Sequence, residues 1–123
     1  MRIFKTRDFD KFARKQKVED NKLCDAIERA QKGSIDAVLN KSVIKQRVSR
    51  QDQGKRGGFR VLIAFRLNKR AVFIHGFPKN AKGNVSQNEL KEITALANAF
   101  LGYGKERIEQ LLKAGGLDRG RVR

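Results

Sequence analysis

Lysine and arginine side chains gather in the middle of the chain, where they could act on a negatively charged substrate. Between residues 41 and 70 there are ten cations and one acid, Asp52, so this window carries +9 of the net charge of +16. The ten are Lys41, Lys45, Arg47, Arg50, Lys55, Arg56, Arg60, Arg66, Lys69 and Arg70. Fixed cations can grip a phosphate backbone and offset the charge that develops on a phosphorane-like transition state. A solvated face is the alternative for any single cation, but it fits the whole set less well, because the predicted strands lie in the same window.

The sequence also has one histidine, His75, in the predicted last strand. Imidazole changes charge near neutral pH, which suits a general base or acid. A structural role for His75 in a strand fits equally well. The single cysteine, Cys24, lies in an apolar helical stripe and is expected to be a small core residue. One histidine and one cysteine are too few for a usual zinc site, so we predict no metal and no other cofactor.

The overall composition indicates one folded domain with a polyanionic partner. The chain has 123 residues, of which 39% are hydrophobic and 34% charged, with 29 basic against 13 acidic residues. So large an excess of positive charge favours nucleic acid as the partner. A membrane surface fits less well, since no apolar run approaches the ~18 residues of a spanning helix and no basic amphipathic helix is evident. The start, MRIFKTRDFD, meets charge too soon for a signal peptide, so a cytoplasmic protein is expected.

Apolar periodicity predicts the elements that must position these side chains. Helices are expected over residues 6–16, 19–33, from a cap at Ser86 to Gly102, and 105–116. Strands are expected over residues 1–4, at a sheet edge, and over 42–49, 59–67 and 71–77, with a tight turn at 67–70. Ser86 and Glu89 have the S-x-x-E spacing of a capping box. The last three strands should form an antiparallel meander.

This order, β-α-α-β-β-β-α-α, predicts an α+β domain with a small antiparallel sheet of about four strands. Helices should cover one face of the sheet and leave the other free to work. The domain is expected to span residues 1–116, with a basic and flexible tail at 117–123.

Strand alternation predicts which cations share a face. Lys45 and Arg47 are two residues apart and lie opposite the side of their strand that carries Ile44, Gln46 and Val48. Arg60 and Arg66 share one face of the next strand, because their separation is even. If the two faces coincide, these four cations converge.

Two phenylalanines offer a further way to bind RNA. Phe73 and Phe77 should share a face of the last strand, where aromatic rings could stack on bases. Packing in the core is the stronger expectation for both, because the strand is apolar.

The stretch QDQGKRGGFR, residues 51–60, resembles a phosphate-binding loop only superficially. Gly54 and Lys55 are followed by Arg56, and Ser49 stands where that motif requires its first glycine. The stretch is better interpreted as a glycine-permitted connection between two antiparallel strands. It would place Lys55 and Arg56 at its tip and deliver Arg60 onto the sheet.

Three motifs in this region, taken in order, resemble the RelE/HigB-type toxins of bacterial toxin–antitoxin systems. VIKQRVSRQDQGKRGGFRVLIAFR followed by FIHGFPKN contains K-x-R-V-x-R, G-K-x-G-G-x-R and G-F-x-K-N at the spacing of one subgroup. The similarity extends over roughly residues 3–116. It implies a RelE-like fold and an endoribonuclease that acts on messenger RNA, commonly in the ribosomal A site. It also implies an inhibitory antitoxin encoded beside the toxin, and attack of the ribose 2′-hydroxyl on the adjacent phosphate without a metal.

The same resemblance suggests roles for individual residues. By position it implies Lys45, Arg47 and Arg60 as a cationic catalytic site. It implies further phosphate or RNA contacts for Arg50, Lys55, Arg56 and Lys79, with Asn80 either touching RNA or ending the strand. Enzymes of this family often use a tyrosine near the last strand for proton transfer, but here the only tyrosine is Tyr103 in the C-terminal region. The last strand offers His75 instead, and if His75 is structural, Lys45 would take over proton transfer.

Two other functions fit the sequence. A ParE-type toxin of the same fold would act on DNA gyrase and needs no nuclease site, which makes the cationic set harder to explain. A non-catalytic nucleic-acid binder would need only the net charge and the phenylalanines.

Overall fold

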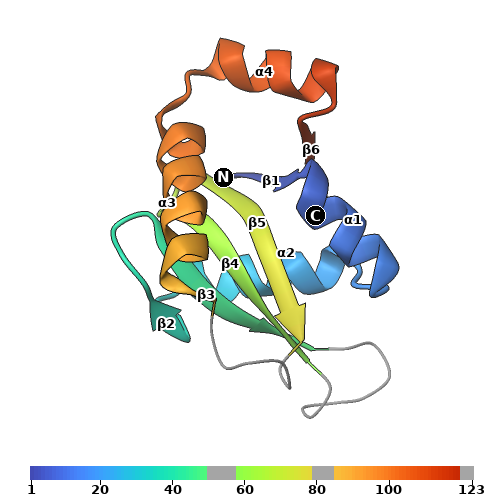
Figure 1. Cartoon of the computed structure of the whole chain (residues 1–123), viewed down its shortest axis with the longest axis vertical. Helices are drawn as coiled ribbons and strands as arrows, with labels where there is room; N and C mark the ends of the chain where they lie inside the picture. Colours follow the sequence, from blue (N-terminus) through green and yellow to red (C-terminus); the bar gives the residue numbers. More distant parts are fainter. Residues whose placement is uncertain (50–57, 79–84, 120–123) are drawn as a thin grey trace.

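The structure is a computed structural model that describes residues 1–49, 58–78 and 85–119, and these residues form an α+β fold around one six-stranded sheet (Figure 1). Across the sheet the strands run in the order β2-β3-β4-β5-β1-β6. Their bounds are β1 (Arg2–Thr6), β2 (Ala37–Val38), β3 (Val43–Val48), β4 (Phe59–Arg66), β5 (Arg70–Pro78) and β6 (Leu117–Arg119). The helices are α1 (Arg7–Lys15), α2 (Asp20–Gln31), α3 (Gln87–Gly102) and α4 (Lys105–Ala114). The predicted α+β class is confirmed.

Local sequence explains where the helices begin and end. Thr6 precedes α1, and its Oγ1 accepts a hydrogen bond from the Phe9 backbone N–H at 3.1 Å. Ser86 and Glu89 form the predicted capping box at the start of α3, with both reciprocal hydrogen bonds at 3.1 Å. α4 ends at Gly115, whose positive φ of 81° glycine adopts without strain. All the predicted helices and strands are present close to their expected bounds.

The sheet is larger than the predicted four strands, and it is mixed. β3, β4 and β5 form the predicted antiparallel meander. β1 pairs in parallel with β5 and antiparallel with β6, so it lies inside the sheet and not at the expected edge. β2 and β6 are unpredicted, because two or three residues are too few to form a recognisable alternating pattern. β6 uses Leu117–Arg119 of the stretch expected as a tail, and the side chain of Leu117 is buried.

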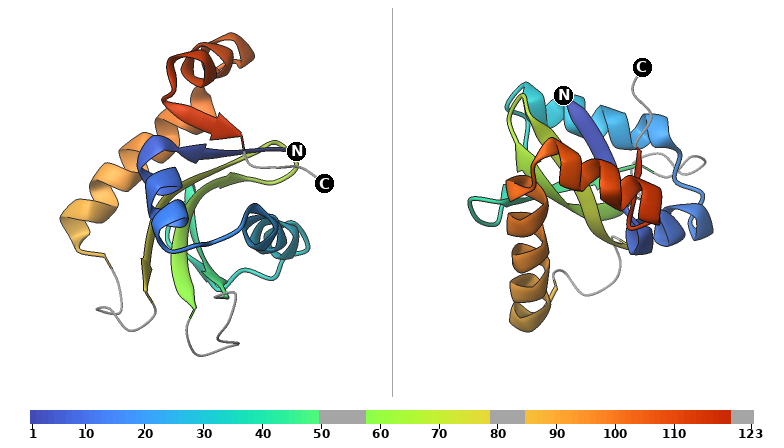
Figure 2. Two further views of the ribbon diagram at one scale, coloured as in Figure 1. Left: turned by 90° about the vertical axis from the view of Figure 1, so that its right-hand side faces the viewer. Right: turned by 90° about the horizontal axis from the view of Figure 1, so that it is seen from above.

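Helices cover both faces of the sheet, where the sequence predicted only one. One apolar cluster joins α1 and α2 to the sheet, and a second joins α3 and α4 to the opposite face. Figure 2 shows the sheet between α2 on one side and α3 on the other. The burial of β4 gives the physical reason: residues 61–64 are all buried, so this strand presents apolar side chains that need cover on both faces.

A buried lysine ties β1 to the two N-terminal helices. Lys5 is 8% exposed, and its Nζ lies 3.0 Å from Asp10 Oδ1 in α1 and 2.9 Å from Asp20 Oδ1 at the start of α2. Burial acts to lower the pKa of Lys5, but the hydrogen bonds and charges of Asp20 and Asp10 outweigh it, and the pKa is raised. Burial acts to raise the pKa of Asp10, but hydrogen bonds and charges from Lys5 and Arg14 outweigh it, and that pKa is lowered. Both ionised forms are therefore stabilised by the fold.

Candidate functional site

Arg47 and Arg60 lie directly opposite each other on the neighbouring strands β3 and β4. Side chains at such a cross-strand pair share one face of the sheet, with Cβ atoms about 5 Å apart. Arg47 is exposed and Arg60 is half-buried. Among residues 1–49, 58–78 and 85–119, no carboxylate forms an ion pair with either guanidinium. Like charges in this position repel, so the pair is suited to binding an anion.

Lys45 and His75 flank this pair on the same face. Leu62 of β4 is the partner of Lys45 on one side and of His75 on the other. Two rows of side chains therefore cross the three strands: Lys45–Leu62–His75 and Arg47–Arg60–Phe77. Leu62 belongs to the cluster under α3, which identifies the face that carries both rows. The register brings together all four residues for which a catalytic role was predicted.

A β-bulge in β5 sets the direction of His75. The pairing shifts between Leu62 and Ile63: Leu62 lies opposite His75 but Ile63 lies opposite Phe73, so β5 contains one extra residue there, Ile74. The bulge changes which face the following side chains point to. His75 therefore points to the same face as Lys45, Arg47 and Arg60.

The bulge also overturns the expectation that Phe73 and Phe77 share a face. Phe73 is buried in the cluster under α1 and α2, whereas Phe77 packs against the cluster under α3. Uninterrupted alternation would have kept the two rings together. Phe77 is half-buried beside Arg60, and its ring centroid lies 5.9 Å from that of His75. Of the two rings, only Phe77 lies beside the cations.

Helix α1 fixes the end of β5 through a glycine. A Cβ at Gly76 would lie 2.3 Å from Cε2 of Phe12, so no larger residue fits without movement. Phe12 in turn packs edge-on against Phe59 of β4, with ring centroids 5.4 Å apart. Gly76 thus seats the strand against α1 between His75 and Phe77.

Arg66 does not lie beside Lys45, Arg47 and Arg60, and the predicted convergence of these four cations is wrong. It is six residues beyond Arg60 on β4, a distance of about 20 Å along an extended strand. Arg66 Nη1 donates to a carbonyl oxygen in the last turn of α3 at 3.4 Å. Its cross-strand partner Arg70 donates from Nη1 to the carbonyl oxygens of Phe100 and Tyr103, both at 2.7 Å. The last turn of α3 has no basic residue of its own, so these arginines satisfy its carbonyl groups.

A pocket of about 440 Å³ lies beside the arginine pair, between α2 and the ends of β3 and β4. Its lining consists of Lys22, Asp25, Arg29, Arg47, Val48, Ser49, Gly58, Phe59 and Arg60. The buried residues Val48 and Phe59 form an apolar floor, and four of the lining side chains are cations. Gly58 permits the close approach of the two strands here, because a Cβ at this position would lie 2.8 Å from the Val48 carbonyl oxygen. The positive surface therefore extends from the sheet face toward α2.

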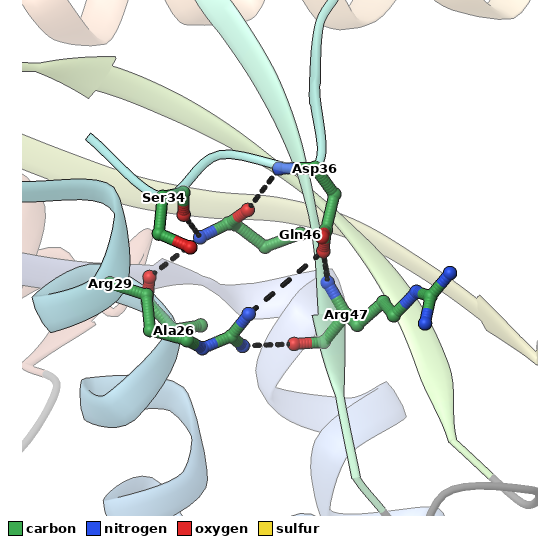
Figure 3. A network of polar contacts seen from close by, with 6 residues as sticks. All are labelled: Ala26, Arg29, Ser34, Asp36, Gln46 and Arg47. Carbon is green, nitrogen blue, oxygen red and sulfur yellow. Dashed lines mark hydrogen bonds and ion pairs between the residues drawn. The ribbon is translucent and has the colours of Figure 1, made fainter.

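A buried amide stands one residue before Arg47, and the sequence suggested no role for it. Gln46 is fully buried, and its Nε2 donates to the carbonyl oxygens of Ala26 at 2.9 Å and Ser34 at 3.1 Å (Figure 3). Its Oε1 accepts a hydrogen bond from the Asp36 backbone N–H at 2.8 Å. The available signal was a glutamine on the apolar face of β3, because a buried amide without partners is costly and so implies a network.

Arg50, Lys55, Arg56, Lys79 and Asn80 lie outside the described residues. Cys24 is buried, as predicted. Within the described ranges, no three or more His, Cys, Asp or Glu side chains are grouped so that they could hold a metal ion. Of the four helices described, none is both long enough and apolar enough to cross a membrane.

A family model described as "RelE toxin of RelE / RelB toxin-antitoxin system" matches residues 1–119, nearly the whole chain. No curated protein sequence matches.

Proposed function

The chain belongs to the RelE toxin family, the toxins of toxin–antitoxin systems with an antitoxin as partner, and from this premise we propose that it is a messenger-RNA endoribonuclease. It would act in the cytoplasm on messages that occupy the ribosome, and cleavage would stop translation. The antitoxin, expected to be encoded beside it, would hold it inactive. An acidic antitoxin segment would suit a chain of net charge +16.

The observation that carries this proposal is the pairing of Arg47 with Arg60, next to the Lys45–Leu62–His75 row. Two arginines held opposite each other without a described carboxylate can bind a bridging phosphate from both sides. Because their backbones are held in a sheet, little reorganisation is needed when negative charge develops on the phosphate. Lys45 would add a third positive charge from the next row.

The proposed reaction is internal transfer at phosphorus. The ribose O2′ forms a bond to the adjacent phosphorus while the bond from phosphorus to the O5′ of the next nucleotide breaks. One fragment ends in a 2′,3′-cyclic phosphate and the other begins with a 5′-hydroxyl. His75 would accept the proton of the 2′-hydroxyl or supply one to the leaving oxygen, and Lys45 is the alternative for that step. The reaction as proposed uses no metal ion, since the cations offset the transition-state charge.

Five further residues are proposed to hold the RNA: Arg50, Lys55, Arg56, Lys79 and Asn80. In the sequence they follow β3, precede β4 or follow β5, next to the strand segments that carry Arg47, Arg60 and His75. Phosphate contacts of this kind set the register of a strand without reading its bases.

Mapping RNA ends in cells that express the chain alone tests the proposal. We expect growth arrest and new 5′ ends inside translated messages. These ends should become clonable only after treatment with polynucleotide kinase, because they carry hydroxyl groups. The Arg60→Ala variant should remain folded and lose the new ends. Arg7→Ala is a matched control, because Arg7 is exposed on α1 and the substitution removes the same charge.

The other candidate functions are distinct outcomes of the same experiment. Intact messages together with DNA damage would point to gyrase as the target. RNA binding that weakens steeply with salt, without strand scission in a translating extract, would indicate a non-catalytic binder. A folded Arg60→Ala variant that cleaves normally would refute the assignment of the site.

A further inference from the structure

Among the residues that the structure describes, no strand pairs with the outer edge of β3 at Arg47. β2 pairs with β3 only through Ala37 opposite Lys45 and Val38 opposite Ile44. In an antiparallel ladder alternate residues direct both backbone polar groups to the same side. Arg47, two residues after Lys45, therefore presents its N–H and C=O to the edge that β2 has already left.

Side chains take the place of the missing strand. The Arg47 backbone N–H donates to Asp36 Oδ2 at 2.6 Å, and the Arg47 carbonyl oxygen accepts from Arg29 Nη2 at 2.5 Å (Figure 3). Arg29 Nη1 also lies 3.9 Å from Asp36 Oδ2, so the two substituting groups form an ion pair. Both backbone groups of Arg47 are thereby held from outside the sheet.

The buried amide of Gln46 fixes the position of Asp36. The Gln46 side chain accepts a hydrogen bond from the Asp36 backbone N–H and donates to the carbonyl oxygens of Ala26 in α2 and of Ser34. These bonds hold the segment between α2 and β2 against β3. Gln46 is fully buried, its bond to the Ala26 carbonyl oxygen is buried with it, and its bonds with Ser34 and Asp36 are partly buried. The carboxylate of Asp36 is held where it reaches the next residue of the strand.

The network and the Arg47 side chain lie on different sides of the strand. Gln46 points toward α2, and by alternation Arg47 points to the opposite face, where Arg60 is its partner. Arg47 is exposed, and Figure 3 shows its guanidinium outside the dashed contacts of the network. The backbone is thus fixed while the side chain is left available for a substrate.

We propose that Asp36 and Gln46 are positioning residues for RNA cleavage, and that they act only through the backbone of Arg47. This inference rests on the proposed function. Arg47 is the next-to-last residue of β3, and in the described part of the chain a strand pairs with it on one side only. Loss of the network would let this end of the strand shift, and a displacement of about 1 Å in a catalytic group can cost up to ~100-fold in rate.

The variants Asp36→Ala and Asp36→Asn separate positioning from general stability. Alanine removes the acceptor for the Arg47 N–H, whereas asparagine keeps an oxygen acceptor and loses the charge. In a translating extract, at equal concentrations of folded protein, Asp36→Ala should lower the cleavage rate by about 10- to 100-fold. Asp36→Asn should restore most of the rate. The control Glu92→Ala removes an exposed acid from α3 and should leave the rate within about twofold of the original chain.

A double-mutant cycle tests the route of action. If Asp36 works through Arg47, then Asp36→Ala should change the slow residual cleavage of the Arg47→Ala variant by less than about twofold. In an Arg60→Ala background, followed over the same long incubation, Asp36→Ala should still lower the rate about tenfold. Equal losses in both backgrounds would show that Asp36 acts independently of Arg47, and the inference would be wrong.

Backbone amide hydrogen exchange distinguishes failure of this inference from failure of the proposed function. In the free protein Asp36→Ala should speed exchange at the Arg47 N–H by at least ~10-fold and leave the Lys45 N–H unchanged. Unchanged exchange at Arg47 would overturn the positioning role, whatever the original chain does to RNA. Faster exchange at Arg47, combined with no cleavage by the original chain, would reject the nuclease proposal and leave the backbone anchor established.

Discussion

Two pairs of arginines face each other across strands of the same sheet, and their surroundings differ. Arg66 and Arg70 form one pair on β4 and β5, and Arg47 and Arg60 form the other on β3 and β4. The first pair donates hydrogen bonds to carbonyl oxygens at the end of α3. The second pair has no ion-pair partner among the described carboxylates. The same cross-strand pairing of two arginines therefore stabilises the end of a helix at one end of the sheet. At the other end it leaves two guanidinium groups without a described ion-pair partner.

The end of α3 accounts for the difference. Burial lowers the pKa of Arg70, and the nearby charges of Arg2 and Arg66 lower it further. The guanidinium nevertheless stays charged, and its bonds to the partially negative helix end offset the repulsion. Among the described residues no helix C-terminus accepts hydrogen bonds from Arg47 or Arg60, which leaves both guanidinium groups suited to the phosphate of the proposed substrate. What an arginine pair does here depends on the acceptors around it.

Removing one member of the open pair should have the largest effect. Arg47→Ala is expected to slow cleavage by about 100- to 1000-fold, the usual cost of losing one preorganised group that stabilises transition-state charge. The free energy of unfolding should stay the same or rise by up to ~1 kcal/mol, because a like-charge pair is relieved. Single-turnover cleavage and urea unfolding measure the two effects. If Arg47→Ala unfolded enough to account for its loss of activity, the pair Arg47 and Arg60 would be structural like Arg66 and Arg70, and the contrast would not hold.

Removing one arginine of the pair Arg66 and Arg70, which caps the end of α3, should lower stability and leave cleavage nearly unchanged. Arg70→Met is expected to lower the free energy of unfolding by about 2–4 kcal/mol, because two charge-assisted hydrogen bonds at 2.7 Å are lost. Cleavage per folded molecule should change by less than about twofold. Lys69→Met is the matched control, since Lys69 is exposed on the turn between the same two strands. Reduced cleavage by fully folded Arg70→Met would give this pair a role in the reaction.

A substitution at Gly76 should test how the packing of β5 against α1 positions His75 and Phe77. Gly76→Ala is expected to cost about 1–3 kcal/mol, because the new methyl group would overlap the Phe12 ring. Cleavage should also slow, since the adjoining His75 is displaced. Adding Phe12→Leu should recover part of both losses. Gly104→Ala is the control, because a Cβ there would meet no described atom within 4 Å. Equal effects of the two glycine substitutions would point to backbone flexibility as the cause.

The ion pairs of buried Lys5 with Asp10 and Asp20 should give the smallest effect, a loss of stability in acid. The pKa of Asp10 is lowered on folding, so its stabilising contribution is complete above the unfolded pKa of about 3.9 and is lost as the pH falls through the folded value. Urea unfolding at about pH 6 and pH 3 should show the advantage of the original chain over Asp10→Asn shrinking by roughly 1 kcal/mol in acid. The pKa of Lys5 is raised, so its contribution is instead lost at alkaline pH. If the original chain were more stable than Asp10→Asn by the same free energy at pH 6 and at pH 3, a lowered pKa of Asp10 would be contradicted.

Sequence periodicity was sufficient to predict the four helices and the four longer strands, and insufficient to predict how the strands are arranged in the sheet. Ser86 and Glu89 marked the start of α3 because a capping box is a local signal. The position of β1 beside β5 depends on a long-range parallel pairing, and no local pattern encodes it. The continuous apolar run of β4 did signal cover on both faces, yet the sheet was interpreted as one-sided. Short strands such as β6 become recognisable only when their partner is known.

The candidate site was predictable where alternation holds. Lys45 and Arg47 fall on one face because β3 is regular, and the pairing of Arg47 with Arg60 follows from a hairpin. The bulge at Ile74 was not predictable, because a single extra residue in β5 leaves the apolar composition unchanged. Proteins place such irregularities where a side chain must be redirected, and His75 is the side chain redirected here.

Capping of α3 by arginines from the sheet has a genetic consequence. Every residue carries a carbonyl oxygen, so side-chain changes at the end of α3 leave the acceptors in place, whereas no basic residue in its last turn can replace a lost arginine. Cells selected for survival of the toxin should therefore carry escape mutations of two kinds. Changes at Arg47 or Arg60 should leave an abundant and harmless protein, while changes at Arg66 or Arg70 should leave little protein at all. Within the single strand β4, the two kinds of survivor should be separated by fewer than ten codons.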